Sequence, residues 1–438
     1  MKTSSTIPIK SPSIFPDVAV IGAGPVGCVT ALAFAHNGAK VLLLEAQPQN
    51  TKRLAGEWLH PPGVEILQHL SIKLDINSSE YFSGQGFVVF PDDGSEPIKL
   101  SYPDGAVAIS CEHNKLVFAL RKVAASHPNI QFLGGAKVIH IEGQKLTFEH
   151  IQQRYNQTIT VGQIVGADGR SSFTRKALGI ANNQILISYM AGVLLEDVEL
   201  PFEGFGHVFL GGPGPALMYR IGTNQIRICL DVPIHSQKKV AYLWDAYSSV
   251  FPKVLLPAFR QALQNNLVVW VANQFSSRTH YGRPGLSLVG DATGHFHPMT
   301  ATGMTMGFLD GECLVRSRNF ATYQRQRKLG TYVPEMLATT LHEAFSRDDD
   351  SAVAIRKAIY QMWRQNPSYC VRTMRLLSGA EANLLSFSGS FLKGVMTAMN
   401  YVLIDAASNH QWQHGTQVLQ SFGQWLKSPA TLALSRLR

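Results

Sequence analysis

Residues 17–45, DVAVIGAGPVGCVTALAFAHNGAKVLLLE, constrain the fold more than any other stretch of the chain. The apolar run 18–21 predicts a buried parallel strand, residues 28–36 predict a helix of small residues, and residues 40–44 predict a second strand. This order is a βαβ unit, whose two strands lie parallel in one sheet with the helix on its face. We therefore expect an α/β protein built on a Rossmann-type domain.

The turn between the first strand and the helix has the pattern of a dinucleotide-binding site. Gly22 permits the tight turn, Gly24 lets the backbone approach a pyrophosphate, and Gly27 lets the helix pack closely on the strand. The helix N-terminus faces the phosphates, and Glu45, at the end of the second strand, can accept hydrogen bonds from a ribose. A glycine-rich turn without a ligand is the alternative, but it leaves Glu45 without a role.

Two later strands end in acidic residues where α/β folds bind ligands. Residues 164–171, IVGADGRS, place Asp168 after a buried strand, and residues 286–292, LSLVGDA, place Gly290 and Asp291 after another. Asp168 alone would indicate only a turn, but after a Rossmann start it fits the same cofactor site. Asp291 can hydrogen-bond a ribityl hydroxyl.

The loop after Asp291 leads into a helix that opens near Gly303. Backbone N–H groups at that helix N-terminus can stabilise negative charge on an isoalloxazine ring. The same loop holds His295 and His297, which are either proton carriers or, as is more common for histidines in polar loops, structural residues.

Length and composition describe a globular protein with two to three domains. The 438 residues are 45% hydrophobic, enough for large cores, and the first 16 lack the apolar segment of a signal peptide. The five cysteines are scattered without metal-binding spacing, which predicts reduced thiols and a cytoplasmic protein.

The net charge of +9 is concentrated in residues 351–438, where nine Lys and Arg face only Glu381 and Asp405. Within this part, the apolar segment 384–403 is too interrupted for a membrane span. We expect the basic C-terminal region to contact the inner face of an anionic membrane peripherally, or an acidic partner. The alternative is a solvated basic face. No nucleic-acid-binding motif accompanies the charge, so nucleic acid is not an expected partner.

The pattern of strands and helices predicts interleaved domains. Residues 1–16 form a flexible tail; residues 17–81, 103–184 and 275–330 form the nucleotide-binding domain; residues 82–102 and 185–274 form a β-sheet substrate domain; and residues 331–438 form a C-terminal helical region.

Three separated motifs, GAGPVG with Glu45, VGADGRSS and LVGDATGHFHPMTATGMT, resemble the flavin fingerprints of the FAD-dependent monooxygenases of the aromatic hydroxylase superfamily. More narrowly, RLAGEWLHPPGVEIL, the ALRKVAA helix, LPFEGFGHVFLGGPGPALMYRIGTNQIRICLDVP and RLLSGAEANLL are similar to squalene epoxidases. The similarity covers most of residues 17–400.

The resemblance implies a flavoprotein that forms a C4a-hydroperoxyflavin from reduced FAD and O2 and passes one oxygen atom to a small apolar substrate. The reaction would be epoxidation of a polyene or isoprenoid, or hydroxylation of an aromatic compound or quinone precursor. No second complete dinucleotide motif appears, so NAD(P)H supplies electrons either directly or through a reductase.

Motif and resemblance together define the expected site. The expected FAD-binding residues are Gly22, Gly24, Gly27, Glu45, Arg53, Arg121, Asp168, Gly290, Asp291, Gly303 and Met304. The family's hydrogen-bonded Gln–Tyr pair near the flavin corresponds here to His60 and Phe87, which are the expected catalytic residues. The family's glycine-rich loop is changed to Ala301-Thr302-Gly303, and squalene itself is therefore not an assured substrate.

Three other functions fit parts of the pattern. A flavin-dependent reductase of isoprenoid double bonds has a similar fold, and a flavin halogenase would need a tryptophan-centred motif that the sequence lacks. The third is a non-catalytic, flavin-bearing membrane partner, in which His60 and Phe87 would mark lost chemistry.

Overall fold

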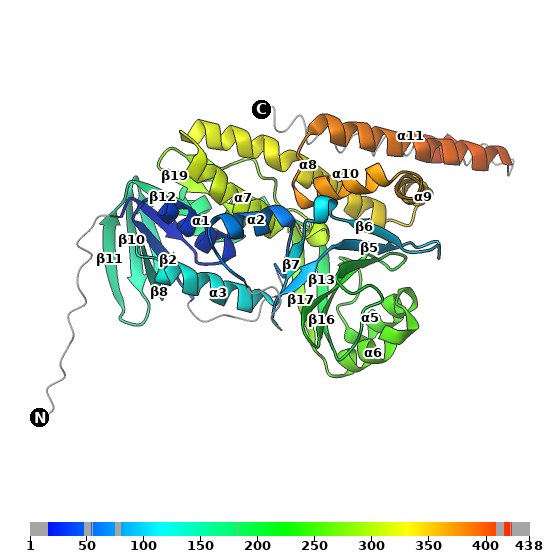
Figure 1. Ribbon diagram of the computed structural model, residues 1–438, viewed down its shortest axis with the longest axis horizontal. Coiled ribbons are helices and arrows are strands. Elements are labelled where there is room, and N and C mark those ends of the chain that lie inside the picture. Colours follow the sequence, from blue (N-terminus) through cyan, green and yellow to red (C-terminus); the bar gives the residue numbers. More distant parts are fainter. Residues whose placement is uncertain are drawn as a thin grey trace, which may run out of the picture.

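The computed structural model describes residues 16–47, 54, 56–74, 80–181, 183–408, 416–420 and 422. Figure 1 shows two large sheets side by side, with C-terminal helices running along one side of the molecule. This arrangement confirms the expected fold class: a Rossmann-type α/β unit, a second β-sheet unit and a helical C-terminal region.

The first large sheet has six strands in the order β18-β19-β12-β1-β2-β8. Its central strand β1 pairs in parallel with β2 on one side and β12 on the other, as the βαβ motif predicts. The strands are β1 (Val18–Ile21), β2 (Val41–Glu45), β8 (Ile130–Gly134), β12 (Gln163–Gly166), β18 (Gly282–Arg283) and β19 (Leu286–Leu288).

Helix α1 (Pro25–His36) begins with Pro25 in its first turn, where a missing N–H costs nothing. The helix is apolar all round, and Cys28, Ala31 and Leu32 are completely buried. It packs between α3 (His113–Ser126) and α7 (Gly303–Arg316) over the sheet, so the turn that precedes it is fixed from several sides.

The second large sheet has seven strands in the order β17-β13-β16-β15-β14-β5-β6. Its outward face is covered by α5 (Val240–Tyr247) and α6 (Leu256–Gln264), which pack on alternate residues of the strands. The strands are β5 (Gly86–Phe90), β6 (Ile98–Ser101), β13 (Ile185–Glu196), β14 (Phe205–Phe209), β15 (Ala216–Gly222), β16 (Gln225–Pro233) and β17 (Val268–Phe275).

Residues 82–102 are divided between two sheets. β5 and β6 pair as a hairpin in the second large sheet, but β4 (Phe82–Gly84) pairs with β7 (Ala108–Ser110) in a small sheet that also holds β3 (Trp58–Leu59). The chain changes sheets at Gly86, whose φ of +145° suits glycine and whose Cβ would lie 2.0 Å from the Leu100 carbonyl oxygen.

The remaining short elements complete the two units. They are α2 (Pro61–His69), β9 (Ala136–Glu142), β10 (Lys145–His150), β11 (Tyr155–Thr160), α4 (Phe173–Ala177) and the 3-10 turns η1 (Pro103–Gly105), η2 (Ser248–Val250), η3 (Lys253–Leu255), η4 (Gly290–Ala292) and η5 (Pro298–Thr300).

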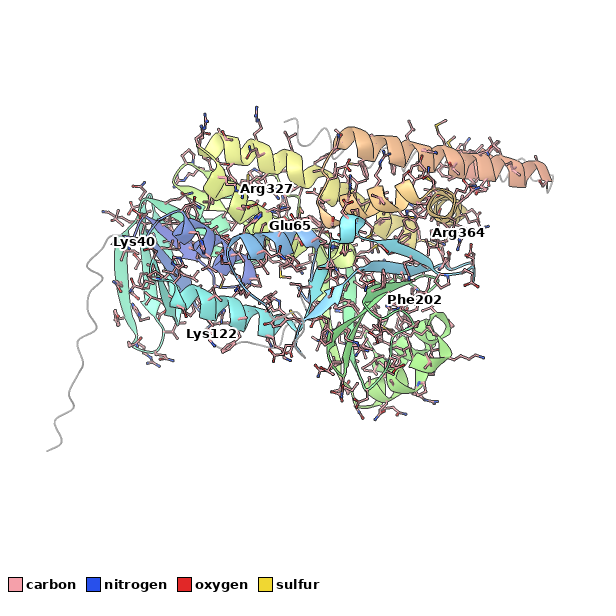
Figure 2. The ribbon with its side chains drawn as sticks, in the orientation of Figure 1. Lys40, Glu65, Lys122, Phe202, Arg327 and Arg364 are labelled. Carbon is pink, nitrogen blue, oxygen red and sulfur yellow. The ribbon has the colours of Figure 1, made fainter. Side chains whose placement is uncertain are left out.

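Four helices follow: α8 (Phe320–Ser346), α9 (Asp350–Gln365), α10 (Pro367–Ser378) and α11 (Leu384–Ser408). Asn319, Asp349 and Asn366 cap the first three through their side chains. Arg327, labelled in Figure 2, anchors α8 to Asp310 on α7, and α8 continues to the second sheet, where His342 contacts Asp231. In the part of the chain that the structure describes, none of the helices has both the length and the hydrophobicity of a membrane span.

Candidate active site

The turn from β1 into α1 leaves an open space in front of a helix N-terminus. A Cβ on Gly27 would lie 1.8 Å from the Gly22 carbonyl oxygen, and one on Gly22 would lie 2.7 Å from that of Ala167, so both positions require glycine. A Cβ on Gly24 would meet no protein atom within 4 Å, and no side chain caps α1 there. The backbone N–H groups of the first turn therefore face a space that suits a pyrophosphate.

Glu45 and Arg121 lie at the edge of this space. The Glu45 carboxylate accepts a hydrogen bond from the backbone N–H of Ala23 (2.8 Å) and lies 3.2 Å from an Arg121 guanidinium nitrogen. Arg121 also donates to the Ala23 carbonyl oxygen (2.7 Å). The structure thus brings the predicted ribose acceptor, the predicted arginine and the glycine turn together, whereas Arg53 lies outside the described residues.

Asp168 and Asp291 have different surroundings. Asp168 accepts hydrogen bonds from the Ser172 hydroxyl and from the backbone N–H and hydroxyl of Thr174, so its carboxylate holds the start of α4. Asp291 is part-exposed and pairs with Arg170 at 3.2 Å. Asp291 is therefore the more available of the two for a ribityl chain.

A second open helix N-terminus lies at the start of α7. No side chain caps it, and a Cβ on Gly303 would meet nothing within 4 Å. Met304, the next residue, is half-buried against the core below the first sheet. The backbone N–H of Gly290 donates to the buried carboxylate of Asp310 on α7 (2.8 Å), which fixes the Gly290-Asp291 turn beside this helix.

His60 is completely buried and fully hydrogen-bonded. Its Nε2 lies 2.8 Å from the Thr300 carbonyl oxygen, which can only accept, so Nε2 carries the ring proton. Its Nδ1 therefore accepts from the Tyr102 hydroxyl (2.5 Å), and the Tyr102 oxygen accepts from Trp58 Nε1 (3.1 Å). Burial lowers the pKa of His60 to about 4 despite the Thr300 bond, so the ring is neutral at pH 7.

Phe87 lies beside this network without a hydrogen-bonding group. Its ring centroid is 5.0 Å from that of Trp58 and 6.0 Å from that of His60. The structure therefore brings the two predicted catalytic residues together, but the hydroxyl that faces His60 comes from Tyr102. Sequence reasoning missed Tyr102, since it stands at the end of β6 before a Pro-Asp-Gly turn and belongs to none of the motifs.

A buried ion pair fixes the segment before β3 to the second sheet. Arg227 on β16 makes two hydrogen bonds of 2.9 Å to the Glu57 carboxylate, which also accepts from the Tyr219 hydroxyl. Burial raises the pKa of Glu57, and Arg227 opposes that shift. This pair, also missed from the sequence, holds Trp58 and His60 against the sheet.

The free energy of unfolding is expected to fall as the pH drops from 6.5 to about 4. Burial lowers the pKa of His60, His207 and His295 to about 4 in the folded protein, from an ordinary value of 6.5. Between these values the unfolded chain binds more protons, so each histidine removes up to about 1.4 kcal/mol of stability per pH unit as the pH falls. The lowered pKa of Asp231 adds to the loss near pH 4, where its carboxyl begins to bind protons in the unfolded chain only.

Urea unfolding at pH 7 and pH 5 measures this loss. His60→Gln removes one of these titrating histidines and should make the pH dependence shallower than in the wild type. An unfolding free energy that is the same at both pH values would contradict the prediction.

The fold and the two open helix N-termini suit a two-unit protein that binds a dinucleotide, and comparison with solved structures supports the fold. The flavin-dependent brominase Bmp2 matches with a TM-score of 0.70 at 16% identity, over 91% of this chain and 100% of that one. A flavoprotein/dehydrogenase from Cytophaga hutchinsonii matches with a TM-score of 0.67 at 17% identity, over 83% of this chain and 93% of that one.

Sequence comparison narrows the class. A family model for squalene epoxidase matches residues 162–410, and one for FAD-dependent oxidoreductases matches residues 17–84. Squalene epoxidase erg1 of Aspergillus fumigatus is 27% identical over 80% of this chain and 79% of its own length. Squalene monooxygenase of Mus musculus is 24% identical over 83% of this chain and 68% of its own length.

The chain belongs to the squalene epoxidase family. It is an FAD-dependent monooxygenase, with NAD(P)H as the electron source typical of the family, which confirms the predicted function class and cofactor. The open cradle at Gly24, the Glu45–Arg121 pair and the uncapped start of α7 fit FAD.

Proposed function

We propose that this enzyme epoxidises a carbon–carbon double bond of a long isoprenoid hydrocarbon, squalene or a polyene like it. Relatives named squalene epoxidase match most of the chain, which supports this substrate class. One atom of O2 enters the epoxide and the other leaves as water, with two electrons from NAD(P)H. Bound FAD supplies the oxygen activation, and the chain's own residues bind, orient and exclude water.

The observation that carries the proposal is the neutral, buried His60–Tyr102–Trp58 network at the junction of the two units. Each N–H and O–H in this network has a partner, so the polar groups need no water. His60 binds the Thr300 carbonyl oxygen of the turn that leads to Gly303, and its backbone N–H donates to Thr305 on α7. His60 and Tyr102 thus fix the turn of residues 298–303, which faces the proposed flavin site, and they hold a proton at the Tyr102 hydroxyl.

The surroundings of this network suit an apolar substrate. Trp58, Phe87 and Tyr102 belong to one buried apolar cluster that continues through Tyr219 on β15 and along α8 through Val333. Phe87 contributes an apolar ring where a hydroxyl would attract water. We therefore assign Phe87 to substrate contact and exclusion of water, and His60 with Tyr102 to hydrogen bonding.

The test is oxygenation of squalene by the purified protein under ¹⁸O2, with FAD, NADPH and a flavin reductase, followed by mass spectrometry. An epoxide carrying one ¹⁸O atom is the expected product. A saturated product formed without O2 would instead favour the double-bond reductase, and a flavin that NADPH and the reductase cannot cycle would favour the non-catalytic reading.

Tyr102→Phe is expected to lower kcat by about tenfold or more, because it leaves the buried Nδ1 of His60 without a donor and frees the ring. Tyr242→Phe is the matched control, since Tyr242 lies on α5, away from the site, and loses only a hydroxyl that donates to Ser236. Steady-state kinetics on both variants measure the two kcat values and so test whether the Tyr102 hydroxyl contributes to the reaction. Equal kcat values for the two would show that the Tyr102 hydroxyl has no role in the reaction.

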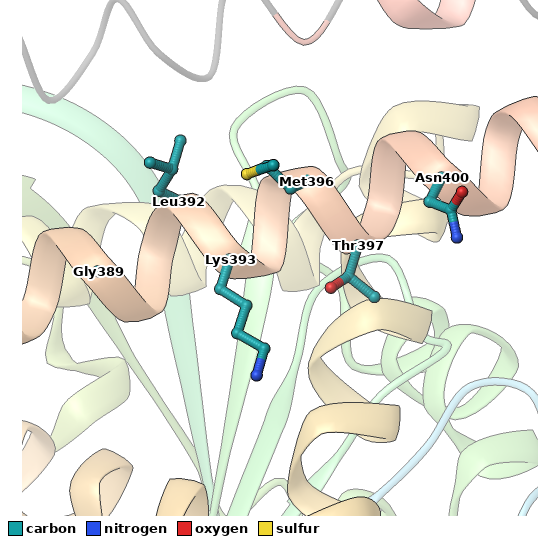
Figure 3. A pocket seen from close by; sticks show the side chains of 6 residues that line it. All are labelled: Gly389, Leu392, Lys393, Met396, Thr397 and Asn400. Atoms are coloured by element: carbon teal, nitrogen blue, oxygen red, sulfur yellow. The ribbon is translucent and has the colours of Figure 1, made fainter.

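We also infer that α11 rests on a membrane surface. Its exposed face carries Leu392 and Met396, 52% and 62% exposed, whereas Lys393 points the other way, toward Tyr369 (Figure 3). These side chains line an open groove on the helix with Gly389, Thr397 and Asn400. An exposed apolar helix face suits a lipid surface, and cosedimentation with anionic and neutral vesicles tests the contact. The reductase that would deliver electrons is likewise a proposed partner.

A further inference from the structure

A buried Asp–His–His cluster lies apart from the expected FAD-binding and catalytic residues. Asp231 comes from β16, His297 precedes η5, and His342 comes from α8, so the cluster joins the second sheet, the flavin-facing loop and the C-terminal helices. His297 Nε2 lies 3.1 Å from Asp231 Oδ1, and His342 Nε2 lies 2.9 Å from Asp231 Oδ2. Asp231 and His297 are 7% and 3% exposed.

The hydrogen bonds determine where the protons are. The backbone N–H of Met299 donates to His297 Nδ1 (3.2 Å), so the neutral ring carries its proton on Nε2 and donates to Asp231. Ser188 and the Asn273 amide also donate to Asp231 Oδ1. Burial raises the pKa of Asp231, but the bonds from His297 and His342 outweigh burial and hold it well below its ordinary value. The carboxylate is therefore an anion surrounded by donors.

This arrangement argues against a metal ion at the cluster. The three side chains offer ligand atoms within 4.8 Å of one another, as a metal site requires. A metal-bound histidine, however, normally donates its second ring N–H to an acceptor. In His297 the second nitrogen instead accepts a hydrogen bond, so Nε2 keeps its proton. The hydrogen-bonded cluster satisfies both ring nitrogens of His297, whereas a metal would break the Met299 bond.

His297 of this cluster stands directly before the turn of residues 298–303, which faces the proposed flavin site. His297 caps η5 through Met299, and the carbonyl oxygen of the next residue, Thr300, accepts from His60. Ala301 then adopts a left-handed conformation (φ +54°), and Gly303 opens α7. The turn is thus held on one side by His60 and on the other by His297, whose ring has its orientation set by Asp231.

We propose that Asp231 and His342 are positioning residues for the oxygenation reaction: they fix the His297 ring and, through it, the 298–303 turn against which the flavin ring binds. This inference rests on the FAD site described above. His342 on α8 donates a hydrogen bond to the second oxygen of the Asp231 carboxylate. Helix α8 therefore supports the proposed flavin site in addition to forming part of the C-terminal helical region.

Three variants separate this role from simple packing. His342→Phe removes the donor to Asp231, whereas His342→Gln keeps an N–H donor. In His297→Asn, the short side-chain oxygen can still accept the N–H two residues on, as Asx turns do, but the side chain no longer reaches Asp231. This variant keeps the local cap and removes only the link to the second sheet.

The expected result is that His342→Phe and His297→Asn raise the Kd for FAD about tenfold and shift the visible flavin absorption band, while His342→Gln stays within about threefold of wild type. FAD fluorescence titration and absorption spectra of the refilled apoproteins measure this. His297→Asn keeps the test decisive if His342→Phe fails to fold.

Two results would overturn the inference. One is wild-type FAD affinity and spectrum in folded His342→Phe and His297→Asn. The other is one equivalent of a transition metal per chain in the purified protein that His342→Phe loses. Failure of the wild type to bind FAD would instead contradict the flavin site itself.

Discussion

Gly24→Ala is expected to weaken FAD binding at least about tenfold without destabilising the apoprotein. The added methyl group would meet no protein atom within 4 Å, and the φ and ψ of Gly24, −71° and 179°, suit alanine. Replacing glycine at such a position generally stabilises a protein by about 0.4–1 kcal/mol. The methyl group would instead occupy the space in front of α1 that we assign to the pyrophosphate. FAD titration and urea unfolding of the apoprotein measure the two effects separately.

Gly27→Ala, three residues further on, is the matched comparison. Its methyl group would lie 1.8 Å from the Gly22 carbonyl oxygen, so the β1–α1 turn must move. We expect a loss of about 3 kcal/mol or more in apoprotein stability, and FAD binding lost together with the fold. Wild-type FAD affinity in Gly24→Ala would show that the pyrophosphate does not lie at this turn.

The nucleotide-binding unit was predictable because its signals are local. Strand, turn, helix and acidic residue follow one another within residues 17–45, and β1, α1 and β2 form there with boundaries shifted by at most a few residues. The acidic ends of β12 and β19 were found for the same reason: in a parallel sheet, residues after neighbouring strands meet at one edge.

The hydrogen-bonding partners within the site were not predictable, because they depend on how distant elements dock. Tyr102 faces His60 across 42 positions of sequence, and Arg227 meets Glu57 across 170. Phe87 was expected at the site because it follows Gly86, as the family's tyrosine follows a glycine. This local alignment contains no information on how the next strand, β6, docks, and so it could not predict that Tyr102 places a hydroxyl beside the same histidine.

The partners of Asp310 also come from distant parts of the chain. Asp310→Ala is expected to lower the free energy of unfolding by about 3–5 kcal/mol. The carboxylate is fully buried on α7. It pairs with the fully buried Arg278 and with Arg327 on α8 (2.7 Å), and it accepts the backbone N–H of Gly290 (2.8 Å). Removing it leaves two arginines buried without their carboxylate and frees the turn that presents Asp291. Urea unfolding, with and without FAD, measures the loss.

Glu312→Ala provides the comparison on the same helix. Glu312 lies two residues beyond Asp310 and pairs with Arg316, whose side chain is 68% exposed, so its loss should cost less than about 1 kcal/mol. Similar costs for the two variants would mean that the buried network contributes no more than a surface ion pair. A large cost at Asp310 alone, with weakened FAD binding, would show that the docking of α8 on α7 and the geometry of the flavin site depend on the same carboxylate. Stability and cofactor affinity would then change together at Asp310 but separately at Gly24.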